Sequence, residues 1–104
     1  MIHDKIIDNL EARLKKSDRY DTVLKCKEYK VHGKFGECDL VALNGYFAVV
    51  FEVKGRDKLK YRKKAYKQLE KDDDWIMDRY RYIERVFKFY VHSKGSNINI
   101  ERVF

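Results

Sequence analysis

Residues 37–54 read ECDLVALNGYFAVVFEVK, and this stretch decides the fold. Asn44-Gly45 separates two apolar runs, Glu37–Leu43 and Tyr46–Val53. Asn-Gly between apolar runs is a favoured two-residue β-hairpin turn. Both runs carry apolar residues on both of their alternating faces, which is typical of strands in the middle of a sheet that is covered on both sides. The stretch therefore predicts a central hairpin.

The sequence before the hairpin predicts a helix and a strand. Apolar residues at helical spacing favour a helix over Ile2–Lys16. Tyr, Val and Thr are frequent over Tyr20–Val31, which favours a first strand, and Gly33–Gly36 favours a turn before the hairpin. The hairpin is therefore expected to receive a third strand on its N-terminal side.

The sequence after the hairpin predicts a long helix and two more strands. The apolar spacing favours a helix from Lys58 to about Arg85, and Asp72–Asp74 offers a break at which Asp74 would cap a second helix. Strands are expected over Val86–Val91 and Ile98–Phe104. Residues 1–104 are thus one α/β domain, in which helices flank a mixed central sheet in the order helix, three strands, helix, two strands.

Composition narrows the class of protein. The 104 residues include 24 Lys plus Arg against 17 Asp plus Glu, a net charge of +7 that favours a polyanionic partner, nucleic acid first. No apolar run approaches the ~20 residues of a membrane span. The first 20 residues carry charges throughout and lack the apolar core of a signal peptide. We therefore expect a cytoplasmic protein without membrane contact. Cys26 and Cys38 belong to the first two strands, so a disulfide between them is one alternative, and reduced thiols in the core are the expected one.

The hairpin gathers acidic residues at one end. A two-residue turn pairs Leu43 with Tyr46, and counting outward places Glu37 opposite Glu52. Side chains that face each other across two strands project from the same side of the sheet, as do side chains two positions apart. Asp39 is then a diagonal neighbour of Glu52, roughly 7–8 Å away between backbones. The sequence therefore places three acids on one face, within reach of one cation.

A divalent cation would explain these acids. Like charges repel, and burying a carboxylate costs several kcal/mol unless it is compensated. Oxygen ligands without His or Cys favour Mg²⁺ or Mn²⁺ over Zn²⁺, and such an ion polarises a phosphate and activates a bound water. Lys54 would orient that water or offset the phosphate charge. Glu11, at the edge of the first helix's apolar stripe, is a further acid, so the third acid is Glu11 or Glu37. The alternative is a hairpin end with solvated charges.

A basic segment follows the acidic site, with Tyr61 and Tyr66 interleaved. A cationic arm that leaves the site by its own strand suits a phosphodiester substrate, although a solvated helix face has the same composition. The candidate DNA-binding residues are Arg56, Lys58, Lys60, Arg62, Lys63, Lys64 and Lys67.

Two short motifs resemble those of the PD-(D/E)XK nuclease superfamily. They are GECDLVA over residues 36–42 and FEVK over residues 51–54. Asp39 matches the first acid of the family motif, and Glu52-Val53-Lys54 matches its E-x-K element. The resemblance implies a restriction-endonuclease-like core of the order α-β-β-β-α-β.

Two further matches lie outside the hairpin, and the branch that the chain most resembles is the archaeal Holliday junction resolvases. Glu11 matches the acid on the family's N-terminal helix, and Lys67–Lys71 contains the Gln-Leu-Glu-Lys of a later helix. Asp72 stands four residues after Gln68, where one variant of the motif has Tyr. The resemblance covers most of the chain, from Glu11 to about Lys71.

The resemblance implies a Mg²⁺-dependent DNA endonuclease, in which Mn²⁺ can substitute and the product carries a 5′-phosphate. It further implies a homodimer acting on branched or four-way DNA, with Lys54 near the attacking water and Gln68 near the phosphate or the water. The implied catalytic residues are Glu11, Asp39, Glu52, Lys54 and Gln68. The implied metal ligands are Asp39, Glu52, Glu11 and the carbonyl of Val53.

Two other functions fit the same sequence. A non-catalytic DNA-binding module would bind DNA in a salt-sensitive manner without cutting it. A subunit of a larger nucleic-acid complex would use the aromatic C-terminal part as its docking surface.

Overall fold

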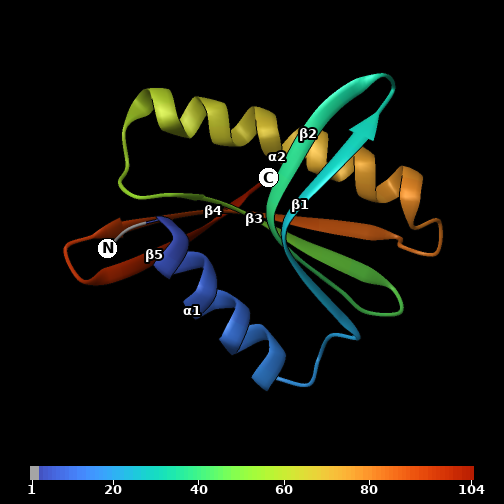
Figure 1. The fold of residues 1–104 in the computed structure, drawn as a ribbon, viewed down its shortest axis with the longest axis horizontal. Coiled ribbons are helices and arrows are strands. Elements are labelled where there is room, and N and C mark those ends of the chain that lie inside the picture. Colours follow the sequence, from blue (N-terminus) through green and yellow to red (C-terminus); the bar gives the residue numbers. More distant parts are fainter. Residues whose placement is uncertain (1–2) are drawn as a thin grey trace.

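The computed structural model describes residues 3–104, and the expected start of the first helix at Ile2 lies outside that range (Figure 1). Its order of elements confirms the predicted helix, three strands, helix and two strands. The helices are α1 (His3–Lys16) and α2 (Leu59–Arg79), and neither is long and apolar enough to cross a membrane. The strands are β1 (Thr22–Val31), β2 (Lys34–Leu43), β3 (Phe47–Lys54), β4 (Arg85–Lys94) and β5 (Asn97–Val103).

The five strands form one mixed sheet in the order β1-β2-β3-β4-β5. Only β3 and β4 run parallel, because α2 connects them as a crossover, and the other neighbours are antiparallel. β3 is therefore the middle strand. This arrangement agrees with the predicted mixed sheet that helices flank.

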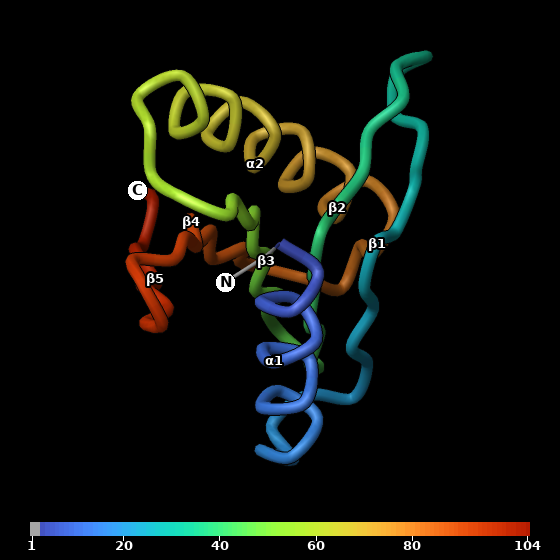
Figure 2. Tube along the Cα trace, turned by 60° about the vertical axis from the view of Figure 1, so that its left-hand side comes forward, coloured from blue at the N-terminus to red at the C-terminus, as the bar shows by residue number. Residues whose placement is uncertain are grey.

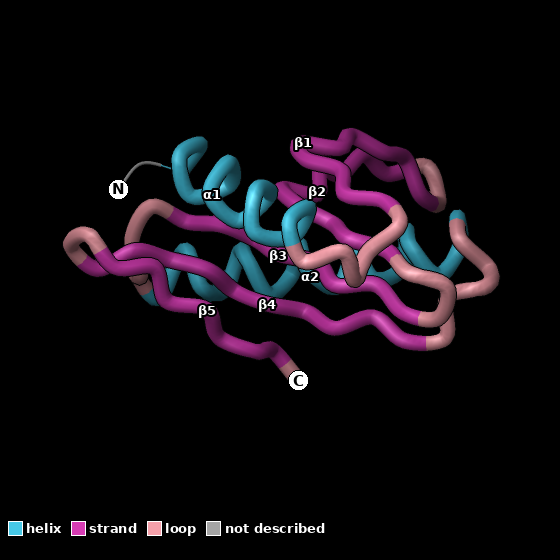
Figure 3. The backbone as a smooth tube through the Cα atoms, turned by 90° about the horizontal axis from the view of Figure 1, so that it is seen from below, coloured by secondary structure: helices cyan, strands magenta, loops and turns pink. Residues whose placement is uncertain are grey.

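The two helices cover opposite faces of the sheet (Figures 2 and 3). α1 buries Ile6, Ile7 and Leu10 against the face that carries Leu40 and Phe51. α2 packs against the other face with Leu69, Trp75 and Ile76, among others. The alternation of apolar residues along β2 and β3 supplies both cores, because neighbouring residues of a strand point to opposite faces.

The hairpin turn differs from the predicted one. Leu43 pairs with Ala48 rather than Tyr46, so three residues, 44–46, connect β2 to β3, and Tyr46 is exposed. The Asn44 side-chain oxygen accepts hydrogen bonds from the backbone N–H groups of Tyr46 and Phe47, at 2.8 and 2.9 Å, which stabilises the wider turn. The shift is two residues, and since side chains alternate with a period of two, Asp39 and Glu52 keep their predicted common face.

Most other boundaries move by a few residues, and α2 differs in kind. α2 ends at Arg79 rather than Arg85, and it runs through Asp72 and Asp74 without the expected break. The reason lies at Asp72, whose carboxylate is fully buried and hydrogen-bonded rather than used as a turn or cap. The first strand begins at Thr22, two residues later than expected. The turn expected over Gly33–Gly36 is shorter, because β2 already begins at Lys34.

β1 and β2 depart from a regular ladder where Cys26 faces Asp39. Their pairing includes Lys25 with Leu40 and Lys27 with Cys38 but skips the pair between them. Cys26 has a φ of 49°, which few residues with a side chain adopt. The outer half of the β1–β2 hairpin bends toward α2 (Figures 1 and 2), and Cys38 packs on the α2 side rather than with Leu40 as regular alternation predicts.

The two cysteines are free and differ in exposure. Cys38 is fully buried, as expected for a core thiol. Cys26 is exposed, which corrects the expectation that both lie in the core, because the irregular backbone at this residue turns it out of the packed layers.

Candidate active site

Asp39 and Glu52 meet where β2 and β3 separate. The pairing of β2 with β3 ends at Leu40 with Phe51, and continuing it by one residue sets Asp39 opposite Glu52. The Asp39 carboxylate fills the resulting gap and accepts a hydrogen bond from the Val53 backbone N–H at 2.8 Å. The N–H and C=O of one strand residue point to the same edge, so the Val53 carbonyl is expected to face this gap as well. Both acids are 6% exposed.

Glu52 carries an uncompensated carboxyl group. Its Oε2 is buried and has no hydrogen-bond partner within residues 3–104, and its Oε1 lies 3.7 Å from Lys54 Nζ. Burial, followed by the charges of Asp39 and Asp72, raises the pKa of Glu52 to about 10, although Lys54 acts in the opposite direction. A pKa raised in this way favours the protonated carboxyl group at neutral pH unless a cation replaces the proton.

His3 adds a ring nitrogen to the site. It is the first described residue of α1, and its Nε2 lies 3.4 Å from Asp39 Oδ2 while its Nδ1 lies 3.1 Å from Asp4. His3 is not among the metal ligands expected from the sequence. The start of α1 and the bend in β2 are far apart in the sequence, so no local pattern reports their proximity.

Gln68 is fixed by three hydrogen bonds behind the acids. Its side-chain amide donates to the Glu37 carbonyl at 2.8 Å, the Asp72 carboxylate at 2.9 Å and the Tyr29 hydroxyl at 3.1 Å. The Tyr29 hydroxyl also donates to Asp72 at 2.5 Å. The network joins β1, β2 and α2, and it fixes Gln68 at the edge of a pocket that Glu52 and Lys54 also line.

Asp72 is a functional-site neighbour that sequence reasoning missed. It is fully buried, and its Oδ2 has no hydrogen-bond partner in the part of the chain that the structure describes. Burial raises the pKa of Asp72 to about 6, while its bonds from Tyr29 and Gln68 oppose that rise. The sequence does contain a signal for Asp72, because it follows Gln68 by four residues and residues i and i+4 share one face of a helix. The three successive Asp residues indicated a helix break instead.

Neither candidate for the third acid is joined to Asp39 and Glu52 by a contact of its side chain. Glu11 lies 3.4 Å from Lys15 and 3.6 Å from Lys25. His3 is the residue of α1 that approaches Asp39. Glu11 follows His3 by eight residues, which places it ~12 Å farther along the axis of the same helix. Glu37 is exposed and lines a shallow pocket with Glu28 and Phe35.

The basic residues after Lys54 divide into two groups. Lys64 and Lys67 line the pocket with Glu52 and Gln68, joined by Lys71, and Arg56 and Lys64 line a neighbouring pocket. Lys58 and Lys60 lie over the ring of Tyr61, at 5.7 and 5.3 Å from its centroid. Lys63 is exposed.

Arg62 belongs to a separate network rather than to the basic surface. Its guanidinium bonds Asp57 at 2.8 Å and Glu101 at 2.9 Å, and Glu101 also lies 2.7 Å from His92. Asp57, His92 and Glu101 bring possible ligand atoms within 4.8 Å of one another. Because Arg62 bonds both carboxylates, the cluster fastens β5 to the start of α2.

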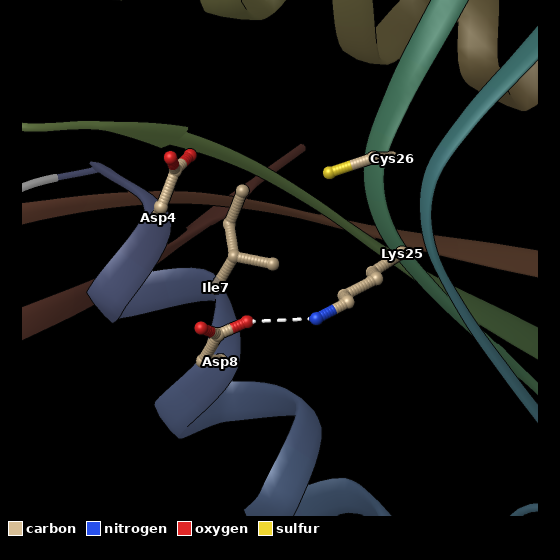
Figure 4. A pocket seen from close by; sticks show the side chains of 5 residues that line it. All are labelled: Asp4, Ile7, Asp8, Lys25 and Cys26. Atoms are coloured by element: carbon tan, nitrogen blue, oxygen red, sulfur yellow. Dashed lines mark hydrogen bonds and ion pairs between the residues drawn. The ribbon is translucent and has the colours of Figure 1, made fainter.

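A further pocket lies between α1 and β1, lined by Asp4, Ile7, Asp8, Lys25 and Cys26 (Figure 4). Asp8 and Lys25 form an ion pair across it at 2.9 Å. Burial, and then the charges of nearby carboxylates including Glu37 and Asp39, raise the pKa of the Cys26 thiol. A raised thiol pKa lowers the fraction of nucleophilic thiolate, so this environment does not favour covalent chemistry at Cys26.

Comparisons with known proteins identify the fold only. No family model matches the sequence, and no curated protein matches it. Among solved structures, the chain is similar to the crystal structure of SSO0001, with a TM-score of 0.52 and 22% sequence identity. The alignment covers 97% of this chain and 49% of SSO0001, so this chain spans about half the length of that protein.

Proposed function

We propose that the protein is a divalent-cation-dependent endonuclease that hydrolyses phosphodiester bonds in DNA. The observation that carries this proposal is the unpartnered, buried Oε2 of Glu52 beside the carboxylate of Asp39. Two buried acids are stable in such proximity when one is protonated or when a cation neutralises them. A second observation points the same way, because cationic side chains surround the acids at the protein surface.

The donor set fits Mg²⁺ or Mn²⁺. Asp39, Glu52 and the Val53 carbonyl would supply hard oxygen ligands, which both ions prefer. His3 would add a nitrogen donor, which Mn²⁺ accepts more readily than Mg²⁺. Glu11 is committed to lysines and is not part of this set. The bound cation would polarise a phosphate oxygen and lower the pKa of a water molecule.

The other residues of the site would bind and orient the substrate. Lys54, at 3.7 Å from Glu52, is positioned to hold the attacking water or a phosphate oxygen. Gln68 would accept a hydrogen bond from the attacking water through its amide oxygen, because its amide nitrogen already donates to three acceptors. Lys64 and Lys67 would neutralise neighbouring phosphates.

A branched substrate and a homodimer remain part of the proposal through the resemblance to Holliday junction resolvases. In such a dimer, two copies of the site would act on opposed strands of a four-way junction. A panel of linear, single-stranded, flapped and four-way DNA distinguishes this substrate class, and light scattering measures the number of copies.

The main test is cleavage by single-residue variants. Asp39→Asn and Glu52→Gln are expected to lower Mg²⁺- or Mn²⁺-dependent cleavage by more than about 100-fold, since even second-shell changes at metal sites cost up to that much. DNA binding should persist in both variants. Glu28→Gln, at an exposed position of β1, is the matched control and should cleave normally. Cleavage at the wild-type rate by either of the first two variants would contradict the proposal.

One observation favours a second function. Because the pKa of Glu52 is raised to about 10, a proton can neutralise the acids without any cation. A DNA-binding module that has no catalytic role would be stable in that form. Such a module predicts salt-sensitive DNA binding and no nicking with either cation.

A further inference from the structure

A second pocket adjoins the candidate active site. It has a volume of about 320 Å³, and its lining comes from the start of α1, the end of β3 and the first half of α2. It shares Lys54 and Lys64 with the neighbouring pocket that contains Glu52 and Gln68. The residues that line it are His3, Lys54, Gly55, Arg56, Tyr61 and Lys64.

The pocket combines one phenol ring with several cations. Lys58 Nζ and Lys60 Nζ lie 5.7 and 5.3 Å from the centroid of the Tyr61 ring, within the range of cation–π attraction. The charges of Lys58 and Lys60 and a hydrogen bond with Arg56 lower the pKa of Tyr61. Tyr61 therefore lies in a strongly positive environment at a partly open surface.

Tyr61 differs in this respect from the next tyrosine of α2. Tyr66 packs edge-on against Tyr90, with ring centroids 6.1 Å apart, and its hydroxyl accepts a bond from Arg62. Tyr66 thus serves the contact between α2 and β4. Tyr61 lines the pocket instead, beside the lysine that contacts Glu52.

We propose that this pocket is a nucleotide subsite, in which Tyr61 stacks on an unpaired base and Arg56 and Lys64 contact the adjoining phosphates. Aromatic rings combined with a cationic groove are the usual means by which proteins bind single-stranded nucleic acid. The volume lies at the low end of small-ligand pockets, which suits one nucleoside rather than a duplex.

This inference rests on the proposed function, which supplies a polynucleotide as the substrate. It adds that the substrate has an unpaired base next to the bound phosphate. The base next to the phosphate at Lys54 must leave its stack to enter the pocket. Single strands, flaps and open junction centres provide such a base at low cost, and continuous duplex does not. Duplex DNA should therefore bind more weakly than single-stranded DNA of equal length.

The test measures binding without cleavage. The probes are single-stranded oligonucleotides that each carry 2-aminopurine at one position, and the position differs from probe to probe. Each probe is titrated with protein in EDTA, and the matched duplexes are titrated in parallel. We expect the fluorescence of at least one single-stranded probe to be quenched on stacking. Tyr61→Leu should abolish this quenching and weaken single-strand binding about 5- to 150-fold, and Tyr61→Trp should retain both. Tyr46→Leu, in the exposed hairpin loop at the other end of β3, is the control and should behave as wild type.

Unchanged binding and quenching in Tyr61→Leu would overturn the subsite, as would equal affinity for duplex and single strand. A melting temperature equal to that of wild type excludes misfolding of this surface variant, and a folded Tyr61→Trp that binds provides a second check. Quenching by a protein that cuts no DNA would support the subsite while contradicting the endonuclease. Cleavage by Tyr61→Leu together with unaltered binding would support the endonuclease while contradicting the subsite.

Discussion

At the scale of single residues, the buried acids determine both stability and chemistry. The charge of Asp39 raises the pKa of both Glu52 and Asp72, and each of these two carboxyl groups has one oxygen without a hydrogen-bond partner among the described residues. Lys54 is the cation that contacts this group directly. The site therefore carries an electrostatic cost that a bound divalent cation would remove.

Asp72 should make the folded state less stable as pH rises. Its pKa is about 6 in the folded protein against an ordinary value of 3.8, so the folded state binds more protons between these values. Stability is then lost as pH rises from about 4 to 6 and stays low above 6. Asp72→Asn keeps an acceptor for Tyr29 and Gln68 and has no charge, so its free energy of unfolding at pH 8 should exceed that of wild type by about 1–3 kcal/mol. Chemical denaturation across pH 4–8 measures this difference, and a difference that is constant with pH would contradict the account.

At the scale of elements, the β1–β2 hairpin is locked to α2 by Tyr29. The Tyr29 ring stacks on Trp75, with centroids 4.6 Å apart and planes 8° apart, and its hydroxyl bonds Asp72. Gly36 lies directly under this ring, because a Cβ at that position would approach the ring's Cζ and hydroxyl oxygen to 2.6 Å. The same contacts orient Gln68 at the site.

Gly36→Ala should destabilise the hairpin. The added methyl group overlaps Tyr29, which cannot move without losing Trp75 and Asp72, and overpacking of this kind costs about 1–3 kcal/mol. A fall in melting temperature of at least several degrees is expected. Gly45→Ala is the matched control, since a Cβ there meets no atom within 4 Å, and it should change stability by less than about 0.5 kcal/mol. Equal melting temperatures for the two variants would show that Tyr29 is free to move.

The elements were largely predictable because their patterns are local. Alternating apolar residues identified β2 and β3 as interior strands, and the period of two preserved the face of Asp39 and Glu52 even though the turn was misjudged by two residues. The contacts of His3 and Tyr29 were not predictable, since each joins segments more than 30 residues apart. Glu11 was expected at the site from its edge position, but helix periodicity fixes a face and not a position along the axis.

At the scale of the whole molecule, the distribution of charge is uneven. Acidic groups are buried between β2, β3 and α2, and lysines surround their opening. The net charge of +7 thus includes a cationic rim around an acidic interior. This arrangement attracts a polyanion to the surface and a small cation to the centre.

Removing lysines from this rim should weaken DNA binding in a salt-dependent manner. In Lys64→Ala/Lys67→Ala, the slope of log affinity against log salt concentration should fall by about two, since each phosphate contact contributes about one. Fluorescence anisotropy between 50 and 200 mM salt measures the slope. Lys16→Ala/Lys94→Ala removes the same charge from exposed positions that line neither pocket, so its slope should fall by less than one. Equal slopes for both double variants would mean that binding reflects net charge alone.

The central claim is that Asp39 and Glu52 hold one divalent cation, and calorimetric titration with Mn²⁺ tests it most directly. At pH 7.5, in two buffers of different ionisation enthalpy, the account predicts one saturable site per chain and release of about one proton, because Glu52 with a pKa of about 10 must lose its proton to bind the ion. Asp39→Asn and Glu52→Gln should abolish the site. No saturable binding to wild type, or equal binding to both variants, would contradict the account.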